Sequence, residues 1–389
     1  MKALVVAPHP FFTPRGTPFS VYYRTLVTAE LGVEVDLLTY GEGQDVVIPG
    51  VRIIRIPRIP GTRNVPVGPS LKKLVLDMVM AVWTLGLLLR HRYDYVHAHE
   101  ESVFFCLAMK PLFGFKLVYD MHSSLPQQLA NFRFTNSRLL TRMFEALERA
   151  ALRSATAVIT ICPDLAEIVK PRIQNPEAHF LIENSIFEAV GLSGGLNGSA
   201  ASIGMPAMPA APVVLYTGTF EAYQGIDLLI DAFARVNAQR RDASLLLVGG
   251  TPAQVAHYRA LADSRGLNGN CTFTGRVPPA TARCLTRRAT VLTSPRVLGT
   301  NTPLKIYEQP ASGIPLVATR IHSHTQVLDD EVCFLVEPTP ESMATGILDA
   351  LSNGSRAESV TRNAMALYES RYSRPVYEEK MRGLLKLLG

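Results

Sequence analysis

The stretch TVLTSPRVLGTNTPLKIYEQPASGIPLVATR, residues 290–320, shows how the chain is organised. Two short runs, TVLTSP (290–295) and PLVATR (315–320), flank a loop and a helical segment. Most of their positions are apolar or β-branched, which is typical of strands buried on both faces of a sheet. A strand, a helix and a second strand in this order predict two parallel strands joined by a crossover.

The same alternation runs through the whole chain. The strand-like runs of the first half are KALVVA (2–7), VEVDLLT (33–39), VRIIRIP (51–57), YDYVHAH (93–99), FKLVYDM (115–121), ATAVITI (155–161) and HFLIEN (179–184). The second half adds VVLYTG (213–218), SLLLVGG (244–250), CTFTG (271–275) and VCFLVE (332–337). This pattern predicts an α/β protein with two Rossmann-like domains, each built on a doubly wound parallel sheet.

The segment between the halves is GLSGGLNGSAASIGMPAMPAAP (191–212), which carries no charge. Its Gly, Ser, Ala and Pro content is typical of a flexible linker. We therefore expect domains over 1–190 and 213–373, with a final helix, 374–389, that packs back on the first domain. Doubly wound sheets bind ligands beyond the carboxyl ends of their strands, so we expect a site in a cleft between the domains.

Composition excludes several other classes of protein. The chain has 389 residues, of which 47% are apolar and 19% charged. These proportions exclude a disordered chain, a collagen-like chain and a small disulfide-rich scaffold. The five cysteines never form a CxxC motif, which favours a reducing compartment and argues against structural zinc. The apolar run Ala3–Ala7 is too short for a secretory signal, so we expect a cytoplasmic protein.

Positive charge is concentrated in residues 52–92, which contain eight Lys or Arg side chains and one acid, Asp77. The same segment includes Leu74–Leu89, an apolar run of 16 residues. A membrane-spanning helix needs about 20 apolar residues, so we interpret this run as a buried or interfacial helix. The charge suits an anionic surface such as the inner face of a membrane. Solvated helix ends and a solvated loop are the alternative, and no nucleic-acid partner is expected.

The loop Gly299–Thr302 is the sharpest candidate for a ligand site. Thr302 is a natural N-cap and Pro303 a natural first helical residue, so we expect the free N–H groups of the first turn to face an anion. Lys305 lies in this turn, with Glu308 three residues later on the same side. A cation and free amides suit a diphosphate, and a carboxylate suits ribose hydroxyls. An ordinary surface Lys–Glu pair is the alternative, but it does not explain the loop.

Weaker candidates follow strands of the first half. Gly16, preceded by Arg15, is expected to open a helix at residues 17–18 whose N-terminus attracts phosphate, with an ordinary loop as the alternative. His97 and His99 share one face of a strand, which can suit a metal ion. No third ligand is evident nearby, so we interpret them as polar side chains lining the site. His122 is a candidate contact to substrate, or else a capping or packed histidine.

These residues resemble the family 4 retaining glycosyltransferases of the GT-B fold, over nearly the whole chain and most strongly from Val213 to Pro338. YTGTFEAYQGIDLLIDAF (216–233) is similar to the family's G-R-x(4)-K-G-x-x-x-L-x-x-A-F, and SLLLVGG, CTFTGRV and TVLTSPR follow in the family's order. PLKIYEQPASGIPLVAT (303–319) resembles x-x-x-L-E-A-M-A-S-G-x-P-V-V-A. YDMHSS (119–124) matches the strand end that carries the family's sugar-contacting histidine, here His122, and LIENS (181–185) matches V-I-P-N-G at Asn184.

The chain departs from the family at its phosphate-binding positions. The family's diphosphate-neutralising Arg and Lys match Thr219 and Gln224, which are uncharged. The first of the family's two glutamates, eight positions apart, matches Thr300, and the second matches Glu308. The Gly-Gly of the family's first loop is residues 15–16 here, Arg-Gly.

Two negative charges in a partly dry cleft need a partner. We therefore expect Arg15, Arg296 and Lys305 to replace the missing cations.

The resemblance implies transfer of a sugar from a nucleotide diphosphate sugar to an acceptor, with retained anomeric configuration, no obligatory metal and no cofactor. The implied catalytic residues are His122, Lys305 and Glu308. The implied contacts to the diphosphate and nucleotide are Arg15, Gly16, Gly218, Gln224, Gly250, Arg276, Val277, Arg296, Lys305 and Glu308. His122, Thr300, Asn301 and Thr302 would face the sugar, with the base near Gly250, Arg276 and Val277.

The acceptor is not identified by the sequence, and a lipid-linked saccharide or a cell-surface glycan precursor is a candidate. Two other functions stay open at this point. A nucleotide-sugar 2-epimerase or hydrolase shares the architecture and needs no acceptor. A non-catalytic partner subunit is favoured by the uncharged Thr219, Gln224 and Thr300.

Overall fold

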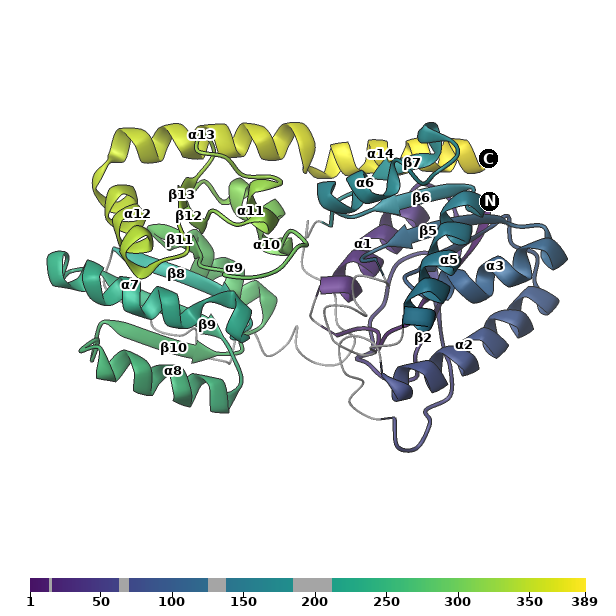
Figure 1. Ribbon diagram of the computed structural model, residues 1–389, viewed down its shortest axis with the longest axis horizontal. Coiled ribbons are helices and arrows are strands. Elements are labelled where there is room, and N and C mark those ends of the chain that lie inside the picture. Colours follow the sequence, from purple (N-terminus) through teal and green to yellow (C-terminus); the bar gives the residue numbers. More distant parts are fainter. Residues whose placement is uncertain (14–15, 63–69, 125–137, 185–211) are drawn as a thin grey trace. The chain divides into compact units, whose positions relative to one another are not determined.

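The computed structural model describes residues 1–13, 16–62, 70–124, 138–184 and 212–389, which form two compact units (Figure 1). The first unit contains the described residues up to Asn184 together with Arg374–Gly389, and the second contains residues 212–373. Of the linker expected over 191–212, all but Pro212 lies outside the described residues, and so does Arg15.

The described part of the first unit is built on a seven-stranded parallel sheet in the order β3-β2-β1-β4-β5-β6-β7. Its strands are β1 (Lys2–Ala7), β2 (Glu34–Thr39), β3 (Val51–Arg55), β4 (Tyr95–His99), β5 (Lys116–Met121), β6 (Ala157–Thr160) and β7 (His179–Leu181). Its helices are α1 (Gly16–Glu30), α2 (Leu71–Arg90), α3 (Ser102–Phe113), α5 (Arg138–Ser154), α6 (Pro163–Val169), η1 (Pro176–Ala178) and α14 (Arg374–Leu388). Strand order therefore reverses between β1 and β4.

The second unit repeats this plan with a six-stranded parallel sheet in the order β10-β9-β8-β11-β12-β13, which reverses between β8 and β11. Its strands are β8 (Val213–Gly218), β9 (Ser244–Gly249), β10 (Cys271–Gly275), β11 (Val291–Ser294), β12 (Leu316–Thr319) and β13 (Phe334–Val336). Its helices are η2 (Ala222–Gln224), α7 (Ile226–Gln239), α8 (Pro252–Ser264), α9 (Pro279–Arg287), α10 (Leu304–Glu308), η3 (Gln309–Ser312), α11 (His322–Thr325), α12 (Pro340–Ser352) and α13 (Gly354–Arg371).

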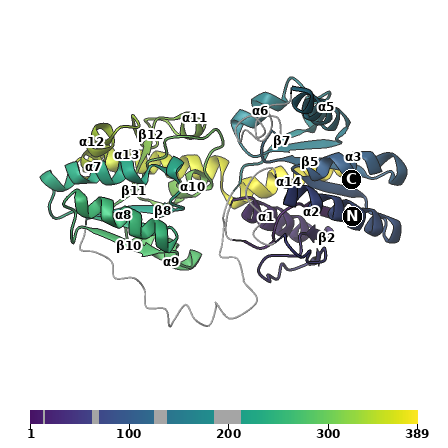
Figure 2. The same ribbon diagram turned by 60° about the horizontal axis from the view of Figure 1, so that its bottom comes forward.

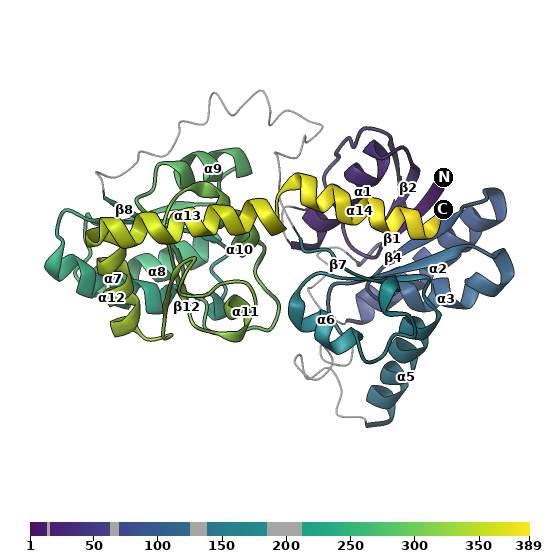
Figure 3. The ribbon, with the colours of Figure 1, turned by 90° about the horizontal axis from the view of Figure 1, so that it is seen from above.

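Each sheet is covered by helices on both faces, because alternate strand residues point to opposite sides. In the second unit, Val214 and Tyr216 belong to a core shared with α7, α8 and α12, whereas Val213 and Leu215 belong to one shared with α9, α10 and α13. α7 and α12 lie side by side (Figure 2). In the first unit, α2, α3, α5 and α6 cover one face. α14 lies beside α1, which packs on β2 (Figure 3).

The predicted α/β class with two doubly wound parallel sheets is confirmed. Each predicted strand contains an observed one, with ends that differ by at most three residues. One helix start in the first unit differs from the expectation. α1 begins at Gly16 itself, so Thr17 and Pro18 lie inside the first turn.

The apolar run forms the helix α2, which has one buried face and one exposed face. Ser70 caps the helix, since its side chain accepts a hydrogen bond from the N–H of Lys73 at 3.2 Å. Leu76, Met80 and Leu87 are buried, whereas the opposite face is exposed. None of the described helices is long and apolar enough to span a bilayer.

Part of the positive charge expected over 52–92 is paired within the first unit. Arg52 binds Asp36 through two hydrogen bonds, of 2.6 and 2.7 Å, and Lys73 forms ion pairs with Glu100 and Glu101. Arg55 donates to the carbonyl oxygens of Glu42 and Gln44, and Arg58 to that of Gly41. Arg63 lies outside the described residues. The exposed cations of this segment in the described part of the chain are Arg52, Arg58, Lys72, Arg90 and Arg92.

Candidate functional site

Polar atoms that are buried without a hydrogen-bond partner follow β8 and β11, the strands at which the order of the second sheet reverses. Among the described residues they are Gln224 Oε1, Thr302 Oγ1, Lys305 Nζ and Gln309 Oε1. An unsatisfied buried polar atom costs about 1–3 kcal/mol, and more when it is charged. Doubly wound sheets bind ligands beyond the strands at such a reversal. These atoms therefore mark a candidate site, at which a bound ligand would supply the missing partners.

Lys305 carries the positive charge of this site. Its Nζ is buried although part of the side chain is exposed, and it lies 4.2 Å from the ring centroid of Tyr216. Burial, assisted by the neighbouring charge of Arg296, lowers the pKa of Lys305 to about 7. Lys305 is also the only lysine of residues 198–373. A buried ammonium with no counter-ion gains most from an anionic ligand.

The Arg296 side chain holds the loop before α10 through hydrogen bonds to two of its carbonyl groups. Its Nε donates to the carbonyl oxygen of Leu298 at 2.6 Å and its Nη1 to that of Asn301 at 3.3 Å. Gly299 is needed here, because it has a φ of 124° and a Cβ would lie 2.1 Å from the Arg296 guanidinium. The N–H groups of Gly299, Thr300 and Thr302 donate to none of the described residues. The loop thus has its carbonyl groups engaged and amide groups available.

The expected cap of α10 is wrong. The helix begins at Leu304, Pro303 is its N-cap residue, and no side-chain oxygen caps it. Pro303 has a ψ of 140°, which keeps it extended rather than helical, and the Thr302 hydroxyl is buried without a partner. The site therefore consists of a loop and the Lys305 ammonium, not of a capped helix N-terminus.

Glu308 and Lys305 do not form the ordinary surface pair considered as an alternative. No ion pair joins them in the described part of the chain. Burial raises the pKa of the Glu308 carboxyl, and the charge of Arg283 opposes that rise. A half-buried carboxylate with no hydrogen-bond donor among the described residues is suited to bind hydroxyl groups.

A hollow of about 390 Å³ lies beside this region, after β9 and β10. Gly250 and Arg276, both predicted to lie near the base, line it together with Phe273 and Arg259. Gly250 has a φ of 80°, and a Cβ there would lie 2.4 Å from the ring of Phe220. Val277 is not among the residues that line the hollow and packs instead against the core. An apolar wall with donor side chains at its rim is suited to a flat heterocycle.

His324 is a residue of this region that sequence reasoning missed. It is fully buried, with Nε2 3.0 Å from Ser294 Oγ and Nδ1 2.8 Å from the carbonyl oxygen of Thr319. Burial lowers the pKa of His324 to about 4, with smaller contributions from Lys305 and Arg296. The neutral imidazole therefore joins the ends of β11 and β12 below the loop. Its place in IHSHT (321–325), directly after a strand, was the available signal.

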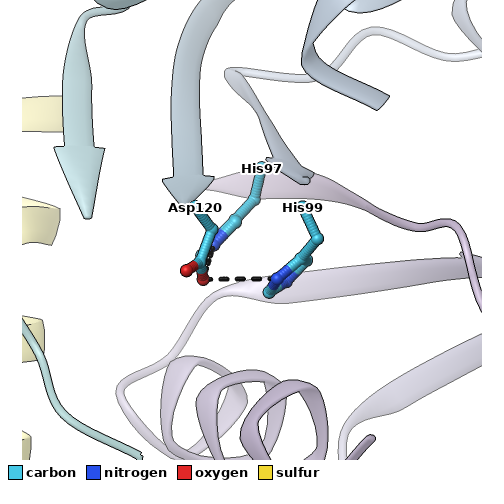
Figure 4. Close-up of side chains that lie close together, drawn as sticks. All are labelled: His97, His99 and Asp120. Carbon is cyan, nitrogen blue, oxygen red and sulfur yellow. Dashed lines mark hydrogen bonds and ion pairs between the residues drawn. The ribbon is translucent and has the colours of Figure 1, made fainter. Parts of the chain in front are cut away.

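The first unit places His97, His99 and Asp120 together where its strand order reverses (Figure 4). His99 and Asp120 are paired residues of β4 and β5, and His97 lies two residues before His99. His97 Nε2 is 2.8 Å from Asp120 Oδ2, and His99 Nδ1 is 3.3 Å from the same oxygen. Asp120 is the third polar group that the sequence did not reveal, because it comes from another strand.

Arg24 of α1 completes this buried cluster and sets its charge. Its Nε lies 3.1 Å from Asp120 Oδ2, and both side chains are at most 1% exposed. Burial alone would raise the pKa of Asp120, but Arg24 and the histidines hold it well below its usual range. Burial lowers the pKa values of His97 and His99, so both rings are neutral near pH 7. A metal ion at Asp120 would meet this guanidinium, so the donor set fits an ion pair better than a metal ion.

His122 belongs to the same cluster. Its Nε2 is 3.1 Å from His99 Nδ1 and 3.3 Å from Asp120 Oδ1, and the residue is 4% exposed. Gly16, the other candidate of this unit, is exposed at the start of α1, and a Cβ there would meet no atom within 4 Å. The position therefore leaves space beside the N-terminus of a 15-residue helix.

Two doubly wound parallel sheets, with a cationic site after the reversal point of the second, define the class of two-domain nucleotide-sugar enzymes of the GT-B type. A sequence model described as "Glycosyl transferases group 1" matches residues 211–353, and one described as "Glycosyl transferase 4-like domain" matches residues 24–181. The chain belongs to the group 1 glycosyltransferases, and the predicted family, fold and transferase activity are confirmed.

Three proteins illustrate the similarity. An alpha-D-kanosaminyltransferase of Streptomyces kanamyceticus is 25% identical over 309 residues, which are 76% of this chain and 77% of that protein. A phosphatidyl-myo-inositol mannosyltransferase of Mycobacterium leprae is 29% identical over 170 residues, 42% of this chain and 43% of that protein. The crystal structure of the Anabaena protein HepE in complex with UDP has a TM-score of 0.70 at 17% identity and covers 99% of this chain and 100% of that one. These similarities favour a transferase over the alternatives of an epimerase or a partner subunit.

Proposed function

We propose that the protein transfers a glycosyl group from a nucleoside diphosphate sugar with retention of anomeric configuration, and that Lys305 neutralises the departing diphosphate. The buried, unpartnered Nζ of Lys305 is the observation that carries this proposal. The positions at which the family places its diphosphate-binding Arg and Lys are Thr219 and Gln224, so Lys305 of α10 would supply the cation instead. HepE, a structural neighbour crystallised with UDP, supports a nucleotide ligand of this kind.

The other contacts follow from the geometry around Lys305. The N–H groups of Gly299, Thr300 and Thr302 would share the negative charge of the β-phosphate. Glu308 would accept hydrogen bonds from the ribose, and the base would occupy the hollow lined by Gly250 and Arg276. Thr300 and Asn301 would face the sugar. Arg296 holds the loop through two carbonyl groups and so acts mainly by fixing its shape.

On the acceptor side, His122 would contact the sugar, and Gly16 would leave room for a substrate phosphate beside α1. We propose no metal and no cofactor, because the site supplies its own cation. We also propose a lipid-linked acceptor at the inner surface of a membrane. The apolar exposed face of α2 supports this, as does the relative that is named for a phosphatidyl-inositol substrate.

Titration calorimetry with UDP, GDP and ADP tests the role of Lys305. Replacement of Lys305 by Ala should lower kcat/KM by about 10²–10³, because one charge-stabilising donor at a transition state is typically worth that much. Nucleotide binding should weaken in parallel. The matched control is Arg288→Ala, which removes an exposed cation of the same unit and should change neither value. Kinetics of Lys305→Ala that equal those of the wild type would refute the assignment.

The pH dependence of binding gives a sharper test. The free ammonium has a pKa of about 7, so above this pH binding of an anion must take up a proton. Wild-type affinity should therefore fall with rising pH by up to about tenfold per unit. Lys305→Arg should remove this dependence, because an arginine stays charged. A wild-type affinity that is flat from pH 6 to pH 9 would contradict the proposal. Retention itself is checked by NMR of the product's anomeric centre.

A further inference from the structure

The exposed face of α2 is apolar along its length. Its exposed apolar side chains, called here the α2 stripe, are Leu71, Leu74, Val75, Met78, Val82, Leu85 and Leu89. They recur every three or four residues, so they lie on one face of the helix. Leu71, Val82 and Leu89 are 76%, 64% and 71% exposed. A contiguous apolar surface of this kind on a folded unit marks an interaction site.

The α2 stripe is not needed for the core of its own unit. The opposite face of the helix supplies the buried side chains Leu76, Met80, Leu87 and Leu88, which pack with the sheet. The polar residues of that face are satisfied within the unit as well. Asp77, the single acid of α2, accepts a hydrogen bond from Tyr40, and Lys73 is paired with Glu101. The exposed face of the helix therefore carries no acidic side chain.

Cationic and aromatic side chains border the α2 stripe on one flank. Lys72, Trp83 and Arg90 are separated by 11 and 7 residues. These separations are about three and two helical turns, so the three side chains share one side of the helix. All three are exposed. Long basic side chains and Trp beside an apolar face are the arrangement that suits the boundary between lipid head groups and acyl chains.

The charges decide which partner fits the face. A second copy of the chain packed by two-fold symmetry would bring Lys72 and Arg90 of the two copies near one another, and α2 has no exposed acid to offset them. An anionic lipid surface supplies the opposite charge along the whole flank. Arg92, exposed just after the helix, adds to the same attraction.

We propose that α2 lies in the plane of an anionic membrane, with the α2 stripe inserted among the acyl chains and with Lys72, Trp83 and Arg90 at the level of the head groups. This inference rests on the membrane side of the proposed function. It differs from the expectation drawn from the charge of residues 52–92 alone, since Arg52, Arg55 and Lys73 form ion pairs within the unit. Apolar insertion supplies most of the attachment, and charge selects the lipid.

Trp83 makes the proposal measurable, because it is the single tryptophan of the chain. The full-length protein is mixed with vesicles of phosphatidylcholine alone, or with a third of the lipid replaced by phosphatidylglycerol. On the mixed vesicles, Trp83 emission should shift to the blue and be quenched by lipids brominated near the glycerol. At about 0.5 M salt, where screening shortens to a few Å, binding should weaken several-fold but persist.

Two pairs of substitutions separate apolar insertion from charge. Leu74→Ser with Val82→Ser should weaken partition into mixed vesicles at least about tenfold at either salt concentration. The matched control is Val47→Ser with Met365→Ser, which removes two exposed apolar side chains elsewhere and should leave partition unchanged. Lys72→Ser with Arg90→Ser should weaken binding only at low salt. Thermal unfolding checks that each variant is folded.

Three results would overturn the proposal. One is the absence of a Trp83 shift with any vesicle. Another is binding that high salt abolishes and that Leu74→Ser with Val82→Ser does not affect, since charge alone would then hold the protein. The third is self-association without lipid that the same pair of substitutions removes, since the face would then bind a second copy. Nucleotide binding in solution, measured without vesicles, tests the donor site separately.

Discussion

Both units bury charge where their strand order reverses, but they balance it differently. In the first unit, Asp120 lies 3.1 Å from Arg24 and within 3.3 Å of three imidazoles, so each charge has a partner. In the second unit, Lys305 has an aromatic ring and another cation as neighbours, and no counter-ion among the described residues. A paired buried charge is a stable part of the fold, whereas an unpaired one is stabilised only when an anion binds. The difference favours a structural role for the Arg24–Asp120 pair and supports the proposed ligand binding at Lys305.

The largest effect is expected when the buried Arg24–Asp120 ion pair of the first unit is broken. Asp120→Asn leaves the Arg24 guanidinium buried without a counter-ion, which should lower the free energy of unfolding by about 3–5 kcal/mol. The folded-state pKa of Asp120 is depressed, so its contribution in the wild type is present above about pH 4 and is lost as pH falls further. Urea unfolding followed by circular dichroism at pH 7 measures the change.

Asp330→Asn is the matched control for this prediction. Its carboxylate pairs with Arg320 at 2.7 Å, but both side chains are exposed. Exposed pairs contribute little to stability, so the unfolding midpoint should hardly move. Equal destabilisation by the two substitutions would show that the buried Arg24–Asp120 pair contributes no more to stability than an exposed pair.

The second prediction concerns Lys305, the buried cation of the second unit. Lys305→Met removes a buried charge, so the ligand-free protein should gain about 1–3 kcal/mol of stability below pH 7. The folded-state pKa of Lys305, about 7, lies below its unfolded value, so the unfolded chain binds more protons between pH 7 and pH 10. Wild-type stability therefore rises over that range relative to the variant, and the gain of the variant disappears near pH 10. A gain that does not depend on pH would mean that folding does not lower the pKa of Lys305.

The two units also differ in how far their sites follow from the sequence. Lys305 was predictable, because loop, cation and carboxylate lie within ten residues of one another. The first cluster was not, because Arg24, His99 and Asp120 meet only through the pairing of β4 with β5 and the packing of α1. The spacing of VHAH and YDMH on neighbouring strands was the one available signal.

Charge patterns predicted the structure less reliably than apolar patterns, because charged side chains find their partners only through the tertiary fold. The strands are apolar at nearly every position, so local sequence identifies them whatever their neighbours are. Some cations of residues 52–92 instead find partners elsewhere in the sequence, such as Asp36 for Arg52 and Glu101 for Lys73. A net charge counted along the chain therefore overestimates the charge at the surface. The expected cap at Thr302 failed because the extended Pro303 moves the helix start to Leu304.

The third prediction separates the roles of Glu308 and Thr300 in the donor site. Glu308→Gln should weaken nucleoside diphosphate binding about tenfold to a hundredfold, because an ionised acceptor forms stronger hydrogen bonds than an amide. Thr300→Ala should change nucleotide affinity little and mainly alter the choice of sugar. Calorimetry with the free diphosphate, followed by kinetics with different donor sugars, checks both. Equal losses of nucleotide affinity would remove the division of roles.

The smallest effect is expected from Gln224→Lys, which adds a cation where the family has one. Gln224 Oε1 is buried and accepts no hydrogen bond from the described residues. A lysine there should bind the same diphosphate as Lys305, but the cost of burying it offsets much of the attraction. We therefore expect nucleoside diphosphate affinity to be unchanged or up to about tenfold tighter, together with a lower melting temperature of the ligand-free variant. Combined with Lys305→Ala, the same substitution should restore part of the lost affinity, since one cation would again face the diphosphate. A clear loss of affinity in the single variant would show that Gln224 binds the donor as a neutral group.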